Sequence, residues 1–306
     1  MRIPRPIGGK VVVITGAARG IGEALAVSLA RRGARVALIG LEPDRLAEVA
    51  QRCGPNAAWW ECDVTDPEAL AQAVEGVRER FRRVDVLISN AGIAIGGPVL
   101  LADPVSYDRV IEVNLLGSIR TVRAFLPLLV SAHGYYLQIA SLAAMAPTPL
   151  MSAYDASKSG IEAFALSLRT EVAHHGVDVG VAYLSFTDTD MTRAGGGPLN
   201  GSRGMRGKLP GPLGQLYELG PAVERIVAGI ERRAPFVYGQ AFIRWIRPLR
   251  WLLPSAAYRT GQRAAAQAEQ AMTDHGVELS QPVGPGGQAD IKARSQRDRE
   301  RHKLRQ

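Results

Sequence analysis

A tyrosine and a lysine four residues apart, Tyr154 and Lys158, are the residues of this chain best suited to proton transfer. On a helix, residues at this spacing lie on one face, so the phenol and the ammonium can point at the same site. A nearby ammonium favours the phenolate and lowers the tyrosine pKa from its ordinary value of about 10. Ser141, thirteen residues earlier, could bond a substrate oxygen and stabilise the negative charge that develops there. Together these residues predict acid–base chemistry on a carbonyl or hydroxyl group.

A glycine-rich segment near the start of the chain, TGAARGIG at residues 15–22, is typical of a turn that holds the phosphates of a dinucleotide. It follows the apolar run Val11–Thr15 and precedes a helical pattern with apolar residues four positions apart. Glycines such as Gly16, Gly20 and Gly22 allow a sharp turn and the close approach of backbone to phosphate. The helix N-terminus adds unpaired N–H groups and the positive end of its dipole. The segment therefore predicts a dinucleotide pocket at the start of the first helix.

Between residues 10 and 190, apolar strand-like runs alternate with helical patterns. Several runs are continuously apolar, which is typical of parallel strands covered on both faces. The repeated order of strand and helix predicts an α/β fold, a Rossmann-type doubly wound parallel sheet. Ligands bind such a sheet at the carboxyl ends of its strands, where Ser141 and the glycine turn both fall. The expected strands are Val11–Thr15, Arg35–Ile39, Ala57–Cys62, Val84–Ser89, Tyr135–Ala140, Val177–Leu184 and Phe236–Tyr238.

The helix that carries Tyr154 and Lys158 is predicted to begin near Ser152 and to reach about residue 173. Ser152 and Asp155 have the spacing of a capping box, in which each side chain bonds a backbone N–H of the first turn. A second helical stretch contains Asn114.

The chain divides into three parts by composition. We expect residues 1–240 to form a single dinucleotide-binding catalytic domain and 241–279 a basic and aromatic helical extension. We expect 280–306 to be a disordered basic tail, because no apolar periodicity remains there. The net charge of +8 is concentrated in residues 241–306, which carry 12 Lys/Arg and 6 Asp/Glu. Because the excess is local, no nucleic-acid partner is expected.

The motifs occur in an order that resembles the short-chain dehydrogenase/reductase family, from about residue 8 to residue 240. The resemblance implies a nicotinamide dinucleotide cofactor, a small-molecule carbonyl or alcohol substrate, and a homodimer or homotetramer formed through the long central helices. It also implies four catalytic residues, Asn114, Ser141, Tyr154 and Lys158. The residues that it places around the cofactor are Gly16, Arg19, Gly20, Ile21, Gly22, Glu42, Asp63, Val64, Asn90, Ala91, Gly92, Tyr154, Lys158 and Thr189.

The resemblance also implies a role for each matching residue. Asp63 would bond the adenine, with Val64 packed beside it. The segment 90–92 would support the central strand and the adenine-side ribose. Asn114 would hold a water that relays protons to the lysine, and Thr189 would hold the nicotinamide carboxamide.

The choice between NAD(H) and NADP(H) depends on the end of the second strand. Members that prefer NAD place an acid there to bond the ribose 2′-hydroxyl. In this chain Gly40 holds that position, and Glu42 comes two residues later. Members that prefer NADP often carry a basic residue where Arg19 stands. Either cofactor is consistent with the sequence, and Arg19 favours NADP(H) slightly.

Two features after residue 184 bear on the substrate. Ser185-Phe186 stands where the family usually has Pro-Gly, which would change the backbone path beside the nicotinamide. Residues 193–214 take the place of the family's substrate lid and contain eight glycines and three prolines, which predicts a mobile loop. The loop contains no acid, and two interpretations stay open: an anionic substrate or carrier such as an acyl thioester, or a basic loop that is only solvated. Its basic residues are Arg193, Arg203, Arg206 and Lys208.

Residues 242–253, FIRWIRPLRWLL, combine arginines three apart with two tryptophans. Two interpretations stay open. The segment could pack over the substrate pocket while the arginine stems reach water, or it could lie on a membrane surface. With no secretory signal and no apolar run of about 18 residues in the sequence, we expect a cytoplasmic protein, with peripheral contact at the inner membrane surface as the alternative.

Metal and disulfide chemistry are not expected. Cys53 and Cys62 form no C-x-x-C pair, and His174-His175 has no further ligands at suitable spacing. The sequence therefore predicts an NAD(P)-dependent oxidoreductase that interconverts a secondary alcohol and a ketone on a lipid, steroid or acyl-thioester substrate. The alternative is a dinucleotide-binding redox sensor, or a membrane-surface interaction protein on the same fold. Neither alternative needs the proton donor that Tyr154 supplies.

Overall fold

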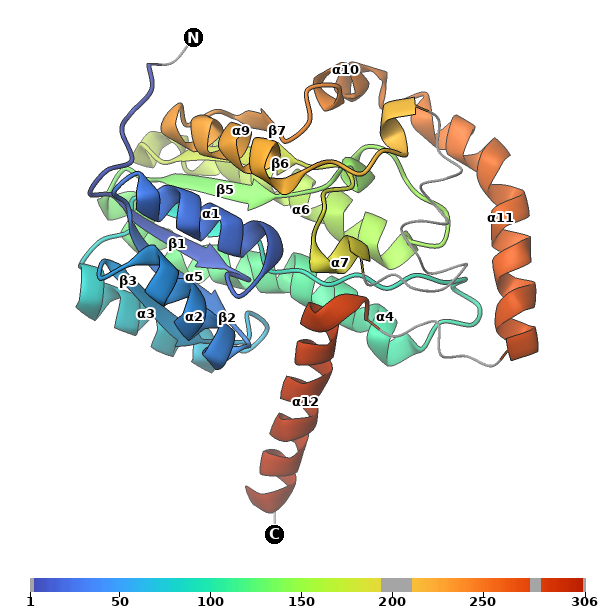
Figure 1. Ribbon diagram of the computed structural model, residues 1–306, viewed down its shortest axis with the longest axis horizontal. Helices are drawn as coiled ribbons and strands as arrows, with labels where there is room; N and C mark the ends of the chain where they lie inside the picture. The colour runs from blue at the N-terminus through green and yellow to red at the C-terminus, as the bar shows by residue number, and fades with distance from the viewer. Residues whose placement is uncertain (1–2, 194–210, 276–281, 305–306) are drawn as a thin grey trace.

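The computed structural model describes residues 3–193, 211–275 and 282–304 of the chain. In these residues, seven strands form one sheet in the order β3-β2-β1-β4-β5-β6-β7, and all neighbouring strands are parallel (Figure 1). The predicted Rossmann-type sheet is therefore confirmed, and each strand lies within two residues of its expected bounds. The strands are β1 (Val11–Thr15), β2 (Arg35–Gly40), β3 (Ala57–Glu61), β4 (Val86–Ser89), β5 (Tyr135–Ile139), β6 (Asp178–Tyr183) and β7 (Phe236–Tyr238).

Helices cover both faces of the sheet, as its continuously apolar strands require. Successive side chains of a strand point to opposite faces. Thus Val12 and Ile14 pack beneath one helical layer, whereas Val11 and Val13 pack beneath the other. The first layer contains α1 (Gly20–Arg31), α2 (Pro43–Cys53) and α9 (Leu219–Glu231), and the second contains α3 (Pro67–Phe81), α5 (Ser118–Ser131) and α6 (Ser152–Glu171).

One continuous helical run, residues 104–131, joins α4 (Pro104–Ile111), the π-helical segment η1 (Glu112–Gly117) and α5. By length and composition alone it could cross a membrane, but 44% of its most apolar window is buried inside the protein. Val122, Phe125 and Leu129 are at most 1% exposed and pack in the core below the sheet. We therefore interpret the run as a core helix.

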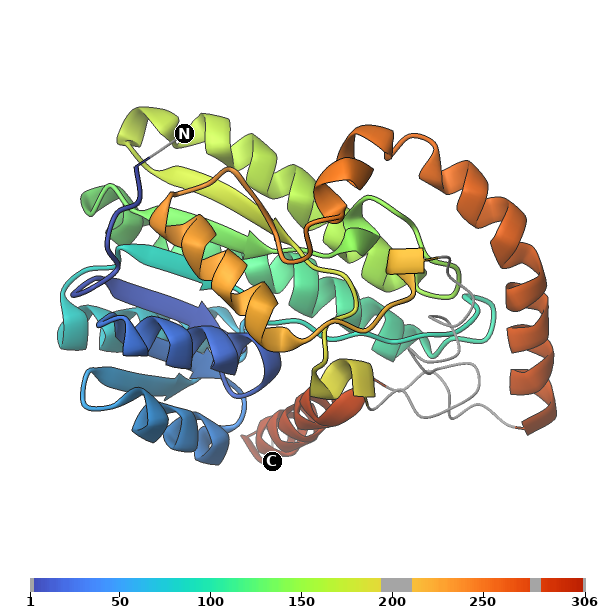
Figure 2. The same cartoon turned by 45° about the horizontal axis from the view of Figure 1, so that its top comes forward.

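After the last strand, the chain forms α10 (Ile243–Ile246), η5 (Arg247–Leu249) and α11 (Leu253–His275). Ile243 is fully buried in the core, so this extension is attached to the domain at its start. Figure 2 shows α11 along one side of the molecule. The shorter elements are η2 (Leu142–Ala144), η3 (Ala173–His175), α7 (Asp190–Arg193) and η4 (Gly211–Leu213).

The structure differs from the expectation of a disordered tail over 280–306, because it contains a helix, α12 (Gly284–Leu304). The first turns of α12 lie against the body of the protein, and the remainder extends away from it (Figure 1). Two polar contacts hold the docked part: Val283 N–H donates to the carbonyl oxygen of Ala94, and Asp290 is paired with Arg109. A search for apolar periodicity cannot detect such contacts.

Candidate active site

The glycine turn joins β1 to α1 at the carboxyl edge of the sheet, and the space around it requires glycine. Gly16 and Gly20 have φ angles of +63° and +57°, which other residues rarely adopt. A Cβ on Gly16 would lie 2.8 Å from the Cα of Ala91, and one on Gly22 would collide with the carbonyl oxygen of Gly16. No described side chain caps the first turn of α1, so its N–H groups are available to a phosphate.

Asn90, directly after β4, ties the glycine turn to the neighbouring strand. Its Nδ2 donates to the carbonyl oxygens of Thr15 and Gly16, each at 3.1 Å. This contact lies at the switch point of the sheet, where a ligand pocket is expected. A pocket opens there, and it is lined by every cofactor residue predicted from the sequence except Gly22, namely Gly16, Arg19, Gly20, Ile21, Glu42, Asp63, Val64, Asn90, Ala91, Gly92, Tyr154, Lys158 and Thr189.

Tyr154 and Lys158 lie one turn apart on α6, with the Lys158 Nζ 5.6 Å from the centroid of the Tyr154 ring. Ser141, two residues after β5, shares a side-chain hydrogen bond with Tyr154. Lys158 is 5% exposed, and its Nζ donates to the carbonyl oxygen of Ile139 at 3.4 Å. The structure therefore brings the phenol and the ammonium together at the β5 side of the pocket, with Ser141 bonded to the phenol.

The pKa of Tyr154 is shifted in the direction opposite to our expectation. Burial raises it to about 12, and the hydrogen bond with Ser141 lowers it by less. Burial also lowers the pKa of Lys158 to about 8. Both shifts have one cause, because a site with little water disfavours the charged form of either group. At neutral pH the pair therefore stands as a neutral phenol beside a protonated amine.

Asn114 lies behind the pocket wall, in the π-helical segment η1. It is fully buried, and its Nδ2 donates to the Ile93 carbonyl oxygen at 2.9 Å and to the Ser157 hydroxyl at 3.0 Å. Its Oδ1 accepts from the Ile93 N–H at 2.8 Å. A Cβ on Gly92 would lie 3.1 Å from that Oδ1 and 3.6 Å from Lys158 Nζ, so Gly92 separates the amide from the amine. Asn114 thus fastens α6 to the chain after β4, and π-helical segments often mark functional sites.

The capping box predicted for α6 does not form. The Ser152 hydroxyl accepts from the Tyr107 hydroxyl at 3.1 Å, and Asp155 Oδ2 accepts from the Thr148 N–H at 2.6 Å. Asp155 is 8% exposed, and its Oδ1 has no hydrogen-bond partner among the described residues. Burial raises the pKa of this carboxyl to about 7, against the lowering effect of the Thr148 N–H. Asp155 is therefore a second titratable group next to Tyr154, which spacing alone did not indicate.

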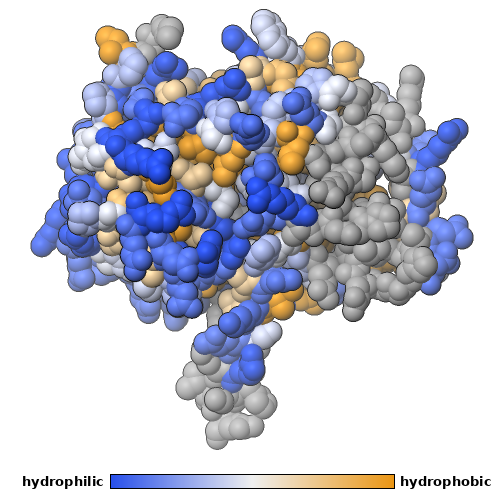
Figure 3. Space-filling model, in the orientation of Figure 1, coloured by the Kyte–Doolittle hydropathy of each residue, from blue (hydrophilic) through white to orange (hydrophobic). Residues whose placement is uncertain are grey.

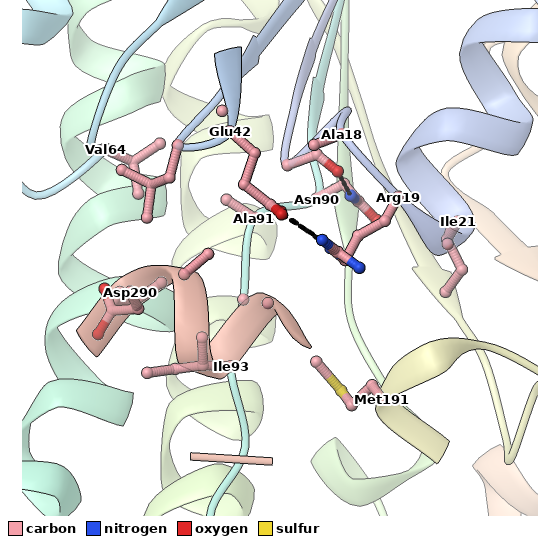
Figure 4. A pocket seen from close by; sticks show the side chains of 18 of the residues that line it. Ala18, Arg19, Ile21, Glu42, Val64, Asn90, Ala91, Ile93, Met191 and Asp290 are labelled. Carbon is pink, nitrogen blue, oxygen red and sulfur yellow. Dashed lines mark hydrogen bonds and ion pairs between the residues drawn. The ribbon is translucent and has the colours of Figure 1, made fainter. Parts of the chain in front are cut away.

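Arg19 lies beside the glycine turn and is held by two carboxylates, of which Figure 4 shows Glu42. Its Nε donates to Glu42 Oε2 at 2.8 Å, a second bond joins the same pair, and its Nη1 lies 3.2 Å from Asp190 Oδ2. Asp190 was missed by sequence reasoning, although it directly follows the predicted cofactor residue Thr189. Arg19 and Glu42, which favour different dinucleotides, are thus joined in one ion pair.

Asp63 is bonded on both sides. Its Oδ1 accepts from the Thr65 N–H and hydroxyl, and its Oδ2 accepts from Arg109 Nη2 at 2.7 Å. Arg109 is 4% exposed and also bonds Asp290 of α12. Sequence reasoning missed Arg109, because an arginine on a helix carries no signal of burial. It also missed the tail residues that line the pocket, Val283, Gly286, Ala289 and Asp290.

The segment that departs from the family's Pro-Gly keeps a defined path. The Ser185 N–H donates to Oε1 of the buried Gln240 at 2.8 Å, and Gln240 Nε2 donates to the Thr187 hydroxyl at 3.1 Å. Thr187 also pairs with Tyr217 in an isolated parallel bridge. These bonds lead the chain from β6 to Thr189 at the pocket.

Of the four basic residues of the loop, Arg193 lies within the described residues. Arg193 pairs with Asp188, with bonds of 2.7 and 2.8 Å, so this arginine already has an anionic partner. Arg203, Arg206 and Lys208 lie outside the described residues.

The family model for short chain dehydrogenases matches residues 10–196. The chain belongs to the short-chain dehydrogenase family. It is 34% identical over 187 residues to the 3-oxoacyl-[acyl-carrier-protein] reductase of Escherichia coli (strain K12), an alignment that covers 61% of this chain and 77% of that one.

Two solved structures share the short-chain dehydrogenase fold. A metagenomic short-chain oxidoreductase in complex with NADP is 36% identical with a TM-score of 0.56, over 58% of this chain and 83% of that one. The crystal structure of gox2181 has a TM-score of 0.70 over 78% of this chain and 96% of that one, and at 24% identity it bears on the fold alone. The chain is thus an oxidoreductase of this family, which acts on CH–OH or keto groups with a nicotinamide cofactor.

The residues of the pocket fit such a cofactor. The glycine turn leaves room for no Cβ at Gly16 or Gly22, and the uncapped start of α1 offers N–H groups to phosphates. Lys158 brings a buried amine to the opposite wall, where ribose hydroxyls could accept from it. On the side that would take the adenosine half, part of the pocket wall comes from α12 and not from the catalytic domain.

Proposed function

We propose that this short-chain dehydrogenase interconverts a secondary alcohol and a ketone, with Tyr154 as acid and base. The observation that carries the proposal is that Tyr154 and Lys158 line the pocket whose other wall is the glycine turn, and that Ser141 hydrogen-bonds Tyr154. When bound, the nicotinamide cofactor supplies or accepts the hydride.

In the reducing direction, the Tyr154 hydroxyl donates its proton to the carbonyl oxygen of the substrate. The Ser141 hydroxyl bonds the same oxygen and stabilises the negative charge that develops on it. The protonated Lys158 lowers the cost of the phenolate that remains, by its charge. Burial of Tyr154 keeps it protonated until the substrate oxygen can take the proton.

The test is a panel of ketones and alcohols, followed through the absorbance of the reduced nicotinamide. We expect Tyr154→Phe to lower kcat at least about 10²-fold, the usual contribution of a general acid, without weakening dinucleotide binding. Tyr258→Phe is the matched control, because Tyr258 is 70% exposed. Full activity in Tyr154→Phe would contradict the assignment and favour a redox-sensing role for the fold.

Among the substrates open to this site, we propose a 3-oxoacyl thioester first and other lipid or steroid ketones second. The 34% identity to a 3-oxoacyl-[acyl-carrier-protein] reductase supports the first choice. A panel of matched ketones, with and without the thioester carrier, tests it. A kcat/KM that is indifferent to the carrier would contradict it.

We propose NADP(H) as the preferred cofactor. Arg19 lines the pocket, and a relative of 36% identity binds NADP. Glu42 acts against this preference, because it occupies the guanidinium and would repel a 2′-phosphate. The preference therefore requires the Arg19 guanidinium to leave the Glu42 carboxylate and bind the 2′-phosphate instead. A kcat/KM at least tenfold better with NADH would overturn the proposal.

A second candidate function, peripheral contact of a cytoplasmic protein with a membrane surface, is favoured by one observation. Trp245, Leu249, Trp251 and Leu252 are 69%, 54%, 84% and 67% exposed. Figure 3 shows hydrophobic side chains at the upper edge of the molecule, over α10. Vesicles of anionic and neutral lipid should pull down the wild type more than a Trp245→Ala/Trp251→Ala variant. If wild type and variant pelleted equally with the vesicles, the proposed membrane contact would be wrong.

Two arginines of this segment, Arg247 and Arg250, contact the domain. Arg250 bonds Glu162 at 3.1 and 3.3 Å, and the Arg247 guanidinium lies 3.5 Å from the centroid of the Phe236 ring. Both arginines therefore attach the segment to the domain, and its apolar side chains would make the membrane contact.

We propose a homodimer or homotetramer through the long central helices α5 and α6, on the strength of family membership. Light scattering of the full chain after size exclusion tests this assembly. A monomer at micromolar concentration would contradict it.

A further inference from the structure

The first two turns of α12 form part of the dinucleotide pocket. Gly286, Ala289 and Asp290 of these turns, and Val283 just before them, line it together with the glycine turn and the residues after β3. The Val283 N–H donates to the carbonyl oxygen of Ala94 at 2.8 Å, and α12 packs against α7 at the pocket rim. Figures 1 and 2 both show the start of α12 beside α7 and its C-terminal part away from the body.

A buried ion pair anchors this docked part. Asp290 is 1% exposed and Arg109 is 4% exposed. Arg109 Nε donates to both carboxylate oxygens of Asp290, at 3.0 and 3.1 Å, and its Nη2 donates to Oδ1 at 2.6 Å. Burial alone would lower the pKa of Arg109, but its bonds to Asp290 and Asp63 outweigh burial and raise that pKa. Pairs of this kind are directional and strong, so the tail is held in one position.

The docked turns lie on the residues that the cofactor's adenosine half would need. A Cβ on Gly286 would lie 3.7 Å from Arg19 Cδ, and Asp290 shares Arg109 with Asp63. In Figure 4 the ribbon that carries Asp290 lies between Ile93 and the Arg19–Glu42 pair and ends near Met191. Two groups cannot fill the same volume, and the Asp290 carboxylate adds negative charge where an anionic ligand would bind.

We propose that α12 is an autoinhibitory segment whose first turns compete with the adenosine half of the dinucleotide, and that the Asp290–Arg109 pair holds it closed. This inference rests on the proposed function, since it takes the pocket to be a dinucleotide site. The cofactor binds only to the open form, so its apparent Kd equals the intrinsic Kd divided by the fraction of open molecules. A tail docked in about nine of ten molecules weakens binding about tenfold.

Two substitutions in the full chain open the tail by different means and change no residue of the domain. Asp290→Ala removes the anchor. Gly287→Val disrupts the docked turn, because a Cβ on Gly287 would lie 2.6 Å from the Cβ of Pro282. Asp274→Ala is the control, since Asp274 is an exposed acid near the end of α11. Calorimetric titration with NADP+ and with NAD+ should show at least about tenfold tighter binding in both tail variants and none of this gain in the control.

Hydrogen exchange of the wild type gives a second readout that needs no variant. Adding the dinucleotide should speed exchange of the backbone amides over residues 283–290, because the ligand displaces them. Slower exchange there would show that α12 closes over the ligand, and would overturn the proposal. Wild type that binds as tightly as both tail variants would also overturn it. If the wild type, both variants and the control are folded but bind neither dinucleotide, the proposed function fails together with the inhibition.

Discussion

The Lys158 ammonium and the Tyr154 ring face each other on one side of α6, 5.6 Å apart. Burial disfavours the charged form of both groups, raising the pKa of the phenol to about 12 and lowering that of the amine to about 8, so at pH 7 the phenol is neutral and the amine still protonated. The Tyr154 phenol therefore keeps its proton until a proton acceptor is present. A substrate oxygen that arrives beside Ser141 supplies the acceptor.

Replacing Lys158 by methionine should stabilise the fold while abolishing activity. In the folded chain, burial lowers the pKa of Lys158 from 10.5 to about 8, so the charged amine costs about 3 kcal/mol at pH 7. The folded state binds fewer protons than the unfolded state between these two pKa values, so this cost disappears as pH rises from about 8 to above 10. Urea unfolding at pH 7 and pH 10 measures the difference.

The stabilising effect of Lys158→Met should be large at pH 7 and small at pH 10. Lys292→Met, at an exposed position of α12, serves as the control and should change neither value. A Lys158→Met variant that is less stable than the wild type at pH 7 would show that the amine is solvated in the folded protein.

Replacing Asp155 by asparagine should stabilise the protein in alkaline but not in acidic solution. Burial raises the pKa of this carboxyl from 3.8 to about 7, so the folded state binds more protons than the unfolded state between those values. The contribution of Asp155 is favourable below about pH 4 and is lost as pH rises through 7. At pH 8 an amide avoids the charge, and we expect a gain of about 1–3 kcal/mol in the free energy of unfolding.

Thermal unfolding of Asp155→Asn and wild type at pH 5 and pH 8 checks this expectation. The Thr148 N–H can still bond the amide oxygen, so that contact is not lost. Equal shifts in melting temperature at both pH values would mean that the effect comes from packing and not from titration.

The parts of the site that could be predicted from sequence are those built from near neighbours. The glycine turn lies within eight residues, and Tyr154 and Lys158 are one helical turn apart, so local geometry determines both. The sheet followed from the alternation of apolar runs, because parallel strands must be covered on both faces. Ser141 was placed correctly at the edge of the sheet because it follows a strand.

The features that could not be predicted depend on distant residues or on burial. Arg109 and Asp290 are 181 positions apart, and no local pattern relates them. The Ser152/Asp155 spacing suggested a cap, but the Asp155 carboxylate instead accepts from the Thr148 N–H in the loop ahead of α6. The direction of the Tyr154 shift was missed for a similar reason, since a pair on one helix face says nothing about how much water surrounds it.

The glycine turn should not tolerate a methyl group at Gly22. Gly22→Ala places a methyl group against the carbonyl oxygen of Gly16, which is backbone and cannot rotate away. We expect a loss of about 1–3 kcal/mol in stability and of measurable dinucleotide binding. Gly54→Ala is the control for backbone strain alone, because its φ is +88° with no atom within 4 Å of the new Cβ, and it should leave binding unchanged. Gly22→Ala with normal binding would mean that the turn is not a phosphate site.

The Arg19–Glu42 pair should control the choice of dinucleotide. Glu42→Gln removes the carboxylate that holds the guanidinium, so Arg19 can turn to a 2′-phosphate, and the ratio of kcat/KM for NADPH over NADH should rise about tenfold, equivalent to about 1.4 kcal/mol. Arg19→Gln should lower the same ratio. Asp190→Asn separates the release of Arg19 from the loss of the Glu42 charge. It weakens the 3.2 Å contact between Arg19 Nη1 and Asp190 Oδ2 but leaves the Glu42 carboxylate in place. Because these charges are partly exposed, raising the salt concentration should reduce the change in the NADPH/NADH ratio of kcat/KM for all three variants. If Glu42→Gln and Arg19→Gln moved kcat/KM for the two cofactors by the same factor, the pair would be a structural contact and the basis of discrimination would lie elsewhere in the pocket.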